Sequence, residues 1–332
     1  MSFRLVVTLF LTVSFPGCQG QIKTPKMEKE TSKLNPLLCD PESGVCEMPT
    51  SGNGGKTQNI VSKNKPVKVI YFTDPICSSC WGIEPQLRRL KLEYGGDVEI
   101  SYHMGGLLPD WSYNSGGISK PSDVAHHWDE VSKYYKMPID GDVWLTDPLD
   151  SSYPPSIAFK AAQLQDKSKA LIFLRLMREM VFLRKKNIAK WERIEQAATQ
   201  AGLDVEQLKA DFEGKGKELF NDDLALGRKL GVRGFPTIFV TNASGETEMI
   251  YGAKPYASFE SSVRKIYSDA QKIPYAKNWE KLFEVYPTLT LREFAELSEI
   301  SFPDAEQQLT DLVKEKQLTV FETKNGAIWT RM

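Results

Sequence analysis

Two cysteines separated by two residues, Cys77 and Cys80, stand where a strand pattern ends and a helix pattern begins. The β-branched and aromatic run Val67–Phe72 predicts a buried strand. Apolar residues spaced by three and four positions through Ile83–Tyr94 predict a helix with one buried face. Val98–Met104 predicts a second strand, so the Cys pair lies inside a β-α-β unit.

The pattern further along the chain completes this unit. A block at about 115–230 has helical periodicity, and Thr237–Thr241 with Glu248–Tyr251 predicts a hairpin. A last helix covers about 255–270. We therefore predict an α/β chain with a thioredoxin-like fold and an inserted helical domain, spanning residues 67–272.

Residues 275–332 predict a separate winged-helix-like module. Thr290 and Glu293 match a capping box, and Asn325-Gly326 is a strong hairpin signal. The module carries seven Lys and Arg against ten Asp and Glu, a net charge of −3, and the whole chain has a net charge of −1. Because phosphate contacts need a basic face, we expect the module to contact protein rather than nucleic acid.

The N-terminus bears on the location of the protein. Residues 1–20 combine a basic start, the apolar run Leu5–Phe15 and small residues, which is typical of a secretory signal. Cleavage after Gly20 predicts an exported protein, and processing before Cys18 predicts a lipid anchor, the one route to a membrane. We expect export to the periplasm or cell envelope; a translation start at Met27 would instead leave the protein in the cytoplasm.

The Cys pair has the spacing of a redox dithiol. Cys77 is expected at a helix N-terminus, where unpaired N–H groups and the helix dipole stabilise a thiolate, so we assign it as the attacking cysteine. Cys80, one turn later, is positioned to resolve a mixed disulfide. Half of a zinc site and a structural disulfide remain as weaker alternatives. We expect no metal and no other cofactor.

Residues near the dithiol have predicted supporting roles. Pro236 opens the third strand, where thioredoxin-like folds place a cis-proline, and the Phe235-Pro236 peptide would offer backbone groups to a substrate, with Gly234 before it. Trp81 is expected to flank the dithiol, although a core position is nearly as consistent. Glu84 lies one helical turn after the second cysteine and would accept its proton, or would simply be solvated.

A second cysteine pair precedes the fold. Residues 21–66 are polar, and the stretch 49–56 matches a flexible linker. Cys39 and Cys46 flank a turn-prone loop in this region and could form a disulfide without strain. We favour a structural clip slightly over the alternative, a second redox pair that exchanges with the first.

The motifs together resemble a known family. The runs Asp74–Pro85 and Gly231–Thr237, with the helical insertion between them, are similar to the DsbA-like, FrnE-type thioredoxin superfamily. The resemblance implies a thiol–disulfide oxidoreductase that acts on protein disulfides and works with a redox partner protein, with Cys77, Cys80 and a cis-Pro236 as its site. Some relatives are instead cytosolic adaptors that deliver the redox regulator Spx to the ClpXP protease, which is our alternative function.

Two departures refine the resemblance. Kappa-class glutathione transferases and chromene-carboxylate isomerases use a serine and glutathione, whereas this chain keeps both cysteines. DsbA has a histidine between its cysteines where this chain has Ser79, which argues against a strongly oxidising dithiol.

Overall fold

The computed structural model describes residues 39–40, 45–47, 65–112 and 120–332. Residues 39–40 and 45–47 are described by their backbone pairing alone. All described residues belong to one compact unit, Lys33–Met332. The signal-like segment, Cys18 and the linker 49–56 lie outside the described residues.

A four-stranded sheet forms the centre of the thioredoxin-like domain, in the order β4-β3-β6-β7. Its strands are β3 (Val67–Thr73), β4 (Val98–Met104), β6 (Thr237–Asn242) and β7 (Thr247–Tyr251). β3 runs parallel to β4 and antiparallel to β6. β3 is almost entirely buried, as expected for a central strand whose β-branched and aromatic side chains pack on both faces.

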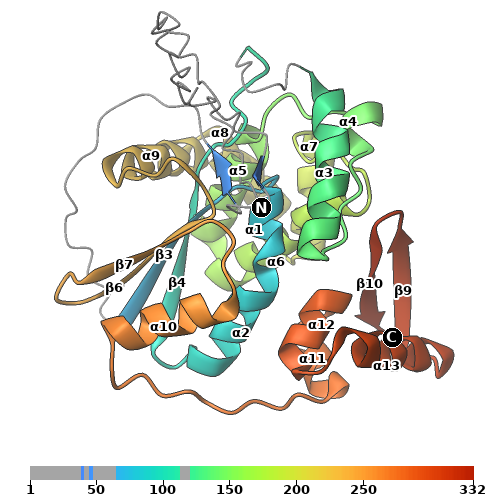
Figure 1. Cartoon of the computed structure of the whole chain (residues 1–332). Coiled ribbons are helices and arrows are strands. Elements are labelled where there is room, and N and C mark those ends of the chain that lie inside the picture. The colour runs from blue at the N-terminus through green and yellow to red at the C-terminus, as the bar shows by residue number, and fades with distance from the viewer. Residues whose placement is uncertain (1–38, 41–44, 48–64, 113–119) are drawn as a thin grey trace, which may run out of the picture. The chain divides into compact units, whose positions relative to one another are not determined.

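Two short helices follow β3 where one longer helix was predicted. α1 (Ser78–Gly82) ends at Ile83, and α2 (Glu84–Tyr94) begins there. Pro85 has no N–H group for the helical ladder, so it occupies the first turn of a new helix instead of kinking a continuous one. α2 contacts α10 (Tyr256–Ile266), which in turn contacts β6 and β7 (Figure 1).

The predicted helical insertion is confirmed, and with it the thioredoxin-like fold class. The inserted helices are α3 (Pro121–Tyr135), α4 (Val143–Thr146), α5 (Tyr153–Gln165), α6 (Lys167–Phe182), α7 (Trp191–Gln200), α8 (Val205–Glu213) and α9 (Lys215–Lys229). Across the part of the chain that the structure describes, none of the helices combines the length and apolarity needed to cross a membrane.

A small sheet that the sequence analysis did not anticipate lies at the end of the central sheet. It has the order β1-β2-β5, with β1 (Cys39–Asp40), β2 (Val45–Glu47) and β5 (Gly234–Phe235). Both pairings are antiparallel. The segment that precedes the thioredoxin-like domain therefore returns to the strand before Pro236.

The C-terminal residues form a compact helical and β module with its own apolar core. Its elements are α11 (Trp279–Val285), β8 (Thr288–Thr290), α12 (Leu291–Ser298), α13 (Phe302–Lys314), β9 (Leu318–Thr323) and β10 (Gly326–Arg331). The capping box of Thr290 with Glu293 is confirmed, as is the hairpin around Asn325-Gly326. α11 and β8, which pairs with β10, were not predicted. The proposed domain boundaries stay a prediction.

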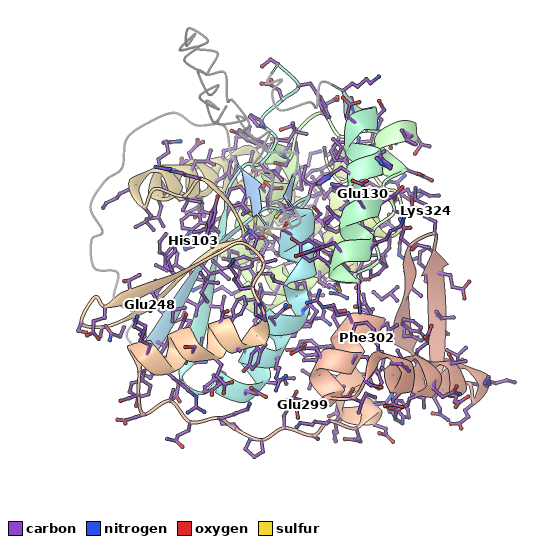
Figure 2. The ribbon with its side chains drawn as sticks, viewed as in Figure 1. His103, Glu130, Glu248, Glu299, Phe302 and Lys324 are labelled. Atoms are coloured by element: carbon purple, nitrogen blue, oxygen red, sulfur yellow. The ribbon has the colours of Figure 1, made fainter. Side chains whose placement is uncertain are left out.

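The tip of the β9–β10 hairpin contacts the inserted helices. Asn325 Nδ2 donates hydrogen bonds of 2.8 Å to both Asp129 Oδ1 and the Ile139 carbonyl. Lys324 Nζ lies 2.7 Å from Asp129 Oδ2. Figure 2 shows Lys324 at this tip, level with Glu130 of α3. The Asn-Gly turn thus both reverses the chain and anchors the module.

Candidate functional site

The dithiol lies at the start of α1, as predicted. Cys77 is the N-cap residue, and its Sγ accepts a hydrogen bond of 3.1 Å from the Cys80 backbone N–H. Both thiols are reduced, and both side chains are 0% exposed. The geometry brings the two sulfur atoms together at a helix N-terminus but leaves neither accessible from solvent.

Arg178 of α6 supplies the positive charge beside Cys80. Its Nη2 donates a 2.7 Å hydrogen bond to Thr73 Oγ1, which donates to the Tyr71 hydroxyl at 3.1 Å. Burial opposes ionisation of Cys80. Its hydrogen bond with Cys77, the charge of Arg178 and hydrogen bonds with Thr73 and Tyr71 outweigh burial, so the pKa of Cys80 lies below its ordinary value.

Cys77 has the opposite shift. Burial raises the pKa of Cys77 well above its ordinary value, and interaction with Cys80 raises it further. The pair therefore accommodates one negative charge, held on the Cys80 side by Arg178. We predicted the lower pKa at Cys77 from the helix N-terminus alone, and the structure places the stronger stabilisation at the other thiol. Which cysteine attacks and which resolves stays a prediction.

Asp74 joins three segments beneath the dithiol. Its carboxylate accepts hydrogen bonds from Ile76 N at 3.0 Å, from Leu107 N at 2.8 Å and from Ser152 Oγ at 2.8 Å. Burial raises the pKa of Asp74 to about 6, although these hydrogen bonds oppose the shift. The carboxylate is therefore a structural acceptor that is held in an unfavourable, buried position.

The Phe235–Pro236 peptide is cis, as expected for this fold. The Phe235 ring is buried and packs against Gly105, where an added Cβ would lie 1.7 Å from its Cζ. Its side chain therefore offers no surface to a partner. The backbone edge that we predicted to receive a substrate is paired instead with this chain's own β2, with Cys46 opposite Phe235 and Glu47 opposite Gly234.

Trp81 is a core residue and does not flank an open site. Its ring is 0% exposed and stacks on Phe182 with ring centroids 5.5 Å apart. The Arg175 guanidinium also lies over the Trp81 ring, 4.4 Å from its centroid. Trp81 Nε1 donates a hydrogen bond of 3.1 Å to the Pro138 carbonyl. Trp81 therefore occupies the core position that the sequence left open, and its substrate-binding role stays a prediction.

Glu84, which we expected either to accept the proton of Cys80 or to be solvated, is paired with Arg178, and its role toward Cys80 stays a prediction. The Glu84 carboxylate forms an ion pair with Arg178 Nη1 and lies 3.9 Å from Arg88 Nε. Arg88 Nε is in turn 3.3 Å from Glu293 of α12, and Arg175 Nη1 is 2.7 Å from the same carboxylate. We call these five residues the buried charge chain: Glu84, Arg88, Arg175, Arg178 and Glu293. The buried charge chain links the dithiol to the C-terminal module.

Sequence reasoning missed the buried charge chain, although a signal was present. Arg175 and Arg178 interrupt the apolar run that forms α6, and Arg is rarely buried unless it is paired. Glu293, the partner of Arg175, was recognised only as a capping residue. The pairing could not be predicted because the partners lie far apart in the sequence.

A cavity of about 360 Å³ lies beside the buried charge chain, between α2, α6 and residues 285–288. Ile172 and Val285 at its rim are 51% and 54% exposed. Searching the described residues for three or more grouped His, Cys, Asp or Glu side chains that could hold a metal ion finds none. A cavity with exposed apolar residues thus lies beside the buried charge chain, while the dithiol is buried.

Comparison with known proteins identifies the family. A family model described as thioredoxin matches residues 71–261. The ClpXP adapter protein SpxH of Halalkalibacterium halodurans is 32% identical over 301 residues, which cover 89% of this chain and 97% of that protein. The chain belongs to the SpxH family. SpxH of Bacillus subtilis is 27% identical over 270 residues, covering 80% of this chain and 89% of that protein.

The solved structures agree on the fold. A candidate protein disulfide isomerase from Nitrosomonas europaea aligns with a TM-score of 0.52 and 19% identity. The alignment covers 61% of this chain and 96% of that one. At this identity the likeness supports the thioredoxin-like fold alone.

The SpxH relationship overturns the predicted activity. We expected a thiol–disulfide oxidoreductase with protein disulfides as substrates and a redox partner protein, and this expectation is wrong. Relatives that cover 80–89% of the chain are ClpXP adapter proteins. The resemblance to DsbA-like enzymes holds for the fold, which hosts different functions in different families.

Proposed function

We propose that this chain is a non-catalytic adaptor that binds a redox regulator of the Spx type and presents it to the ClpXP protease. The observation that carries the proposal is the 32% identity to an SpxH protein over 97% of that protein's length. The match covers 89% of this chain and therefore extends beyond the thioredoxin-like domain. This function is the alternative that the sequence resemblance already implied.

The accessibility of the thiols supports an adaptor over an exchange enzyme. Thiol–disulfide exchange requires a thiolate to reach a sulfur atom of the substrate, and Cys77 and Cys80 are both 0% exposed. An adaptor instead needs a stable surface. The buried charge chain supports such a surface, because it joins the module to α2 and α6 through Glu293.

The adaptor role also favours one of the two predicted locations. ClpXP acts in the cytoplasm, so an adaptor for it must act there as well. We therefore propose a cytoplasmic location, which agrees with the predicted alternative start at Met27 rather than with export.

The proposal is tested by reconstituted proteolysis. The purified full chain is added to ClpXP and Spx from Bacillus subtilis, and the half-life of Spx is followed on gels with and without it. We expect the chain to shorten the half-life. A Cys77→Ser/Cys80→Ser variant should retain this effect, since an adaptor does not need the redox chemistry of the dithiol.

Two controls make the outcome decisive. An unrelated ClpXP substrate should be degraded at an unchanged rate, which excludes general activation of the protease. Insulin reduction by dithiothreitol should be no faster with the chain than without it. Folded protein that neither binds Spx nor changes its half-life would contradict the proposal. Insulin reduction that is lost in the Cys77→Ser variant would also contradict it.

A further inference from the structure

The hairpin formed by β1 and β2 occupies the backbone edge beside Pro236. β2 pairs antiparallel with β5, with Cys46 opposite Phe235. Addition of an extended strand to an exposed edge is a common way in which proteins bind peptides. In this chain the added strand is β2, a segment of the same chain. It carries Cys46 opposite Phe235, the first residue of the cis peptide Phe235–Pro236.

The register of the hairpin places its two cysteines opposite each other. Cys39 of β1 is the direct partner of Cys46 of β2. Directly opposed residues of an antiparallel pair have Cα atoms about 4.5–5.5 Å apart, within the range of about 4.4–6.8 Å that a disulfide spans. The backbone therefore permits a Cys39–Cys46 disulfide without rearrangement.

The strand order distinguishes the two cysteines. Because the order is β1-β2-β5, Cys39 lies one strand spacing, about 4.8 Å, farther from β5 than Cys46 does. α1, which carries Cys80 and begins after Cys77, contacts β2. The second cysteine pair thus lies against both the helix of the dithiol and the strand before Pro236, and Cys46 is its inner member.

We propose that Cys39 and Cys46 form an intrachain redox pair that exchanges its disulfide with Cys77 and Cys80. Oxidised glutathione, or another low-molecular-weight disulfide, first oxidises the hairpin pair and leaves as two thiols. The Cys77 thiol then passes its proton to the neighbouring Cys80 thiolate and attacks Cys46 Sγ. A Cys77–Cys46 bond forms, the Cys39–Cys46 bond breaks, and Cys39 leaves as a thiolate that accepts the proton of Cys80.

The second step completes the transfer. The Cys80 thiolate attacks Cys77 Sγ, Cys46 leaves as a thiolate, and a Cys77–Cys80 disulfide remains. Two electrons have moved from the dithiol to the hairpin pair; Cys39 takes up the one proton that the dithiol releases, and the Cys46 thiolate takes a proton from solvent. The exchange goes beyond the proposed adaptor function and does not depend on it, since no partner protein takes part.

The intermediate is trapped in the full chain carrying Cys80→Ser, which cannot resolve it. The protein is treated with oxidised glutathione, and remaining thiols are blocked with N-ethylmaleimide. Digestion with trypsin and with a protease that cleaves after Glu separates Cys39 from Cys46, because Glu42 lies between them. Mass spectrometry should then find Cys46 linked to Cys77 and Cys39 blocked.

Matched controls address the alternatives. Isotope-labelled and unlabelled chains are mixed before oxidation, and linked peptides should carry one label only, as an intrachain bond requires. Cys39 linked to Cys77 as the dominant species would contradict the register argument. A Cys39–Cys46 disulfide that persists while Cys77 is blocked or bound to glutathione would identify a structural clip and overturn the proposal.

A second measurement keeps the dithiol intact, in case serine at position 80 weakens the fold. Formation of the Cys77–Cys80 disulfide is followed in wild type and in a Cys39→Ser/Cys46→Ser variant. Once the hairpin disulfide has formed, it faces the dithiol at an effective concentration on the order of 1 mM, whereas the variant's buried dithiol must react with oxidised glutathione directly. We therefore expect slower formation of the Cys77–Cys80 disulfide in the variant. An equal rate would overturn the proposal, whereas loss of Spx degradation would bear only on the adaptor function.

Discussion

Removing the charge of Glu293 should loosen the attachment of the C-terminal module. Glu293 is 0% exposed, and its carboxylate accepts hydrogen bonds of 2.7 and 3.0 Å from the two terminal nitrogens of Arg175. Arg88 Nε lies 3.3 Å away. Both arginines belong to the thioredoxin-like domain, so one carboxylate of α12 neutralises charges on two other helices.

The substitution Glu293→Gln isolates this charge. Glutamine keeps the length of the side chain and can still accept from the Thr290 backbone N–H, so the capping box survives. The two arginines, in contrast, are left with less neutralising charge in a buried site. Glu293→Ala removes both the charge and the cap, and should therefore be the more destabilising variant.

The size of the effect follows from the pKa of Glu293. Burial alone would raise this pKa, but the charges of Arg175 and Arg88 lower it from 4.5 to about 2. A shift of this size corresponds to about 3 kcal/mol in favour of the folded state at neutral pH. Breaking a buried ion pair by removing one partner costs about 3–5 kcal/mol, so we expect Glu293→Gln to lower the free energy of unfolding by about 3 kcal/mol.

Urea denaturation followed by tryptophan fluorescence and circular dichroism measures this loss. Because the folded-state pKa of Glu293 is lowered, its stabilisation is present above pH 4.5 and declines as the pH falls toward 2. The difference between wild type and Glu293→Gln should therefore shrink on acidification. The control is Glu284→Gln in the same module, whose ion pair with Lys281 is exposed. A loss below about 1 kcal/mol at neutral pH, or a difference independent of pH, would refute the reasoning.

Three further predictions concern the dithiol region. Arg178→Met should raise the pKa of Cys80, seen as a shift of the thiolate ultraviolet absorbance to higher pH, and Arg178→Lys should raise it less; an unchanged titration would contradict the assigned role of the guanidinium. Burial raises the pKa of Asp74 to about 6, so the protonated carboxyl favours the folded state. This contribution to stability is complete below pH 3.8 and is lost as the pH rises through about 6. The stability difference between wild type and Asp74→Asn should therefore change across that window, and a flat difference would argue against a buried, titrating carboxyl. Gly105→Ala should cost about 1–3 kcal/mol in urea denaturation because its Cβ overlaps the Phe235 ring, whereas Gly96→Ala, which meets only the flexible end of Ile273, should cost less; equal losses would contradict the clash.

The SpxH relationship shows what the cysteine motif predicts and what it does not. The Cys-Ser-Ser-Cys run and the Phe-Pro strand start correctly predicted a thioredoxin-like fold, because both follow from short-range pattern and backbone chemistry. They did not determine the function. A dithiol becomes a catalyst only when a substrate can reach it, and burial depends on parts of the chain remote from the motif.

The sequence by itself determined the local elements of this protein. The buried strand β3, the helix start at Cys77, the Thr290 capping box and the Asn325-Gly326 turn each depend on a few neighbouring residues. Only the tertiary structure decided which charge stands beside Cys80. Arg178 reaches Thr73 across 105 positions, and no local propensity encodes such a pairing.

The same holds for two other long-range links of the fold. β2 pairs with β5 across almost 190 residues, and Arg175 meets Glu293 across 118. Such contacts form because buried charges need partners and exposed strand edges attract other strands. The sequence supplies the residues for both, but the folded chain selects which of them meet.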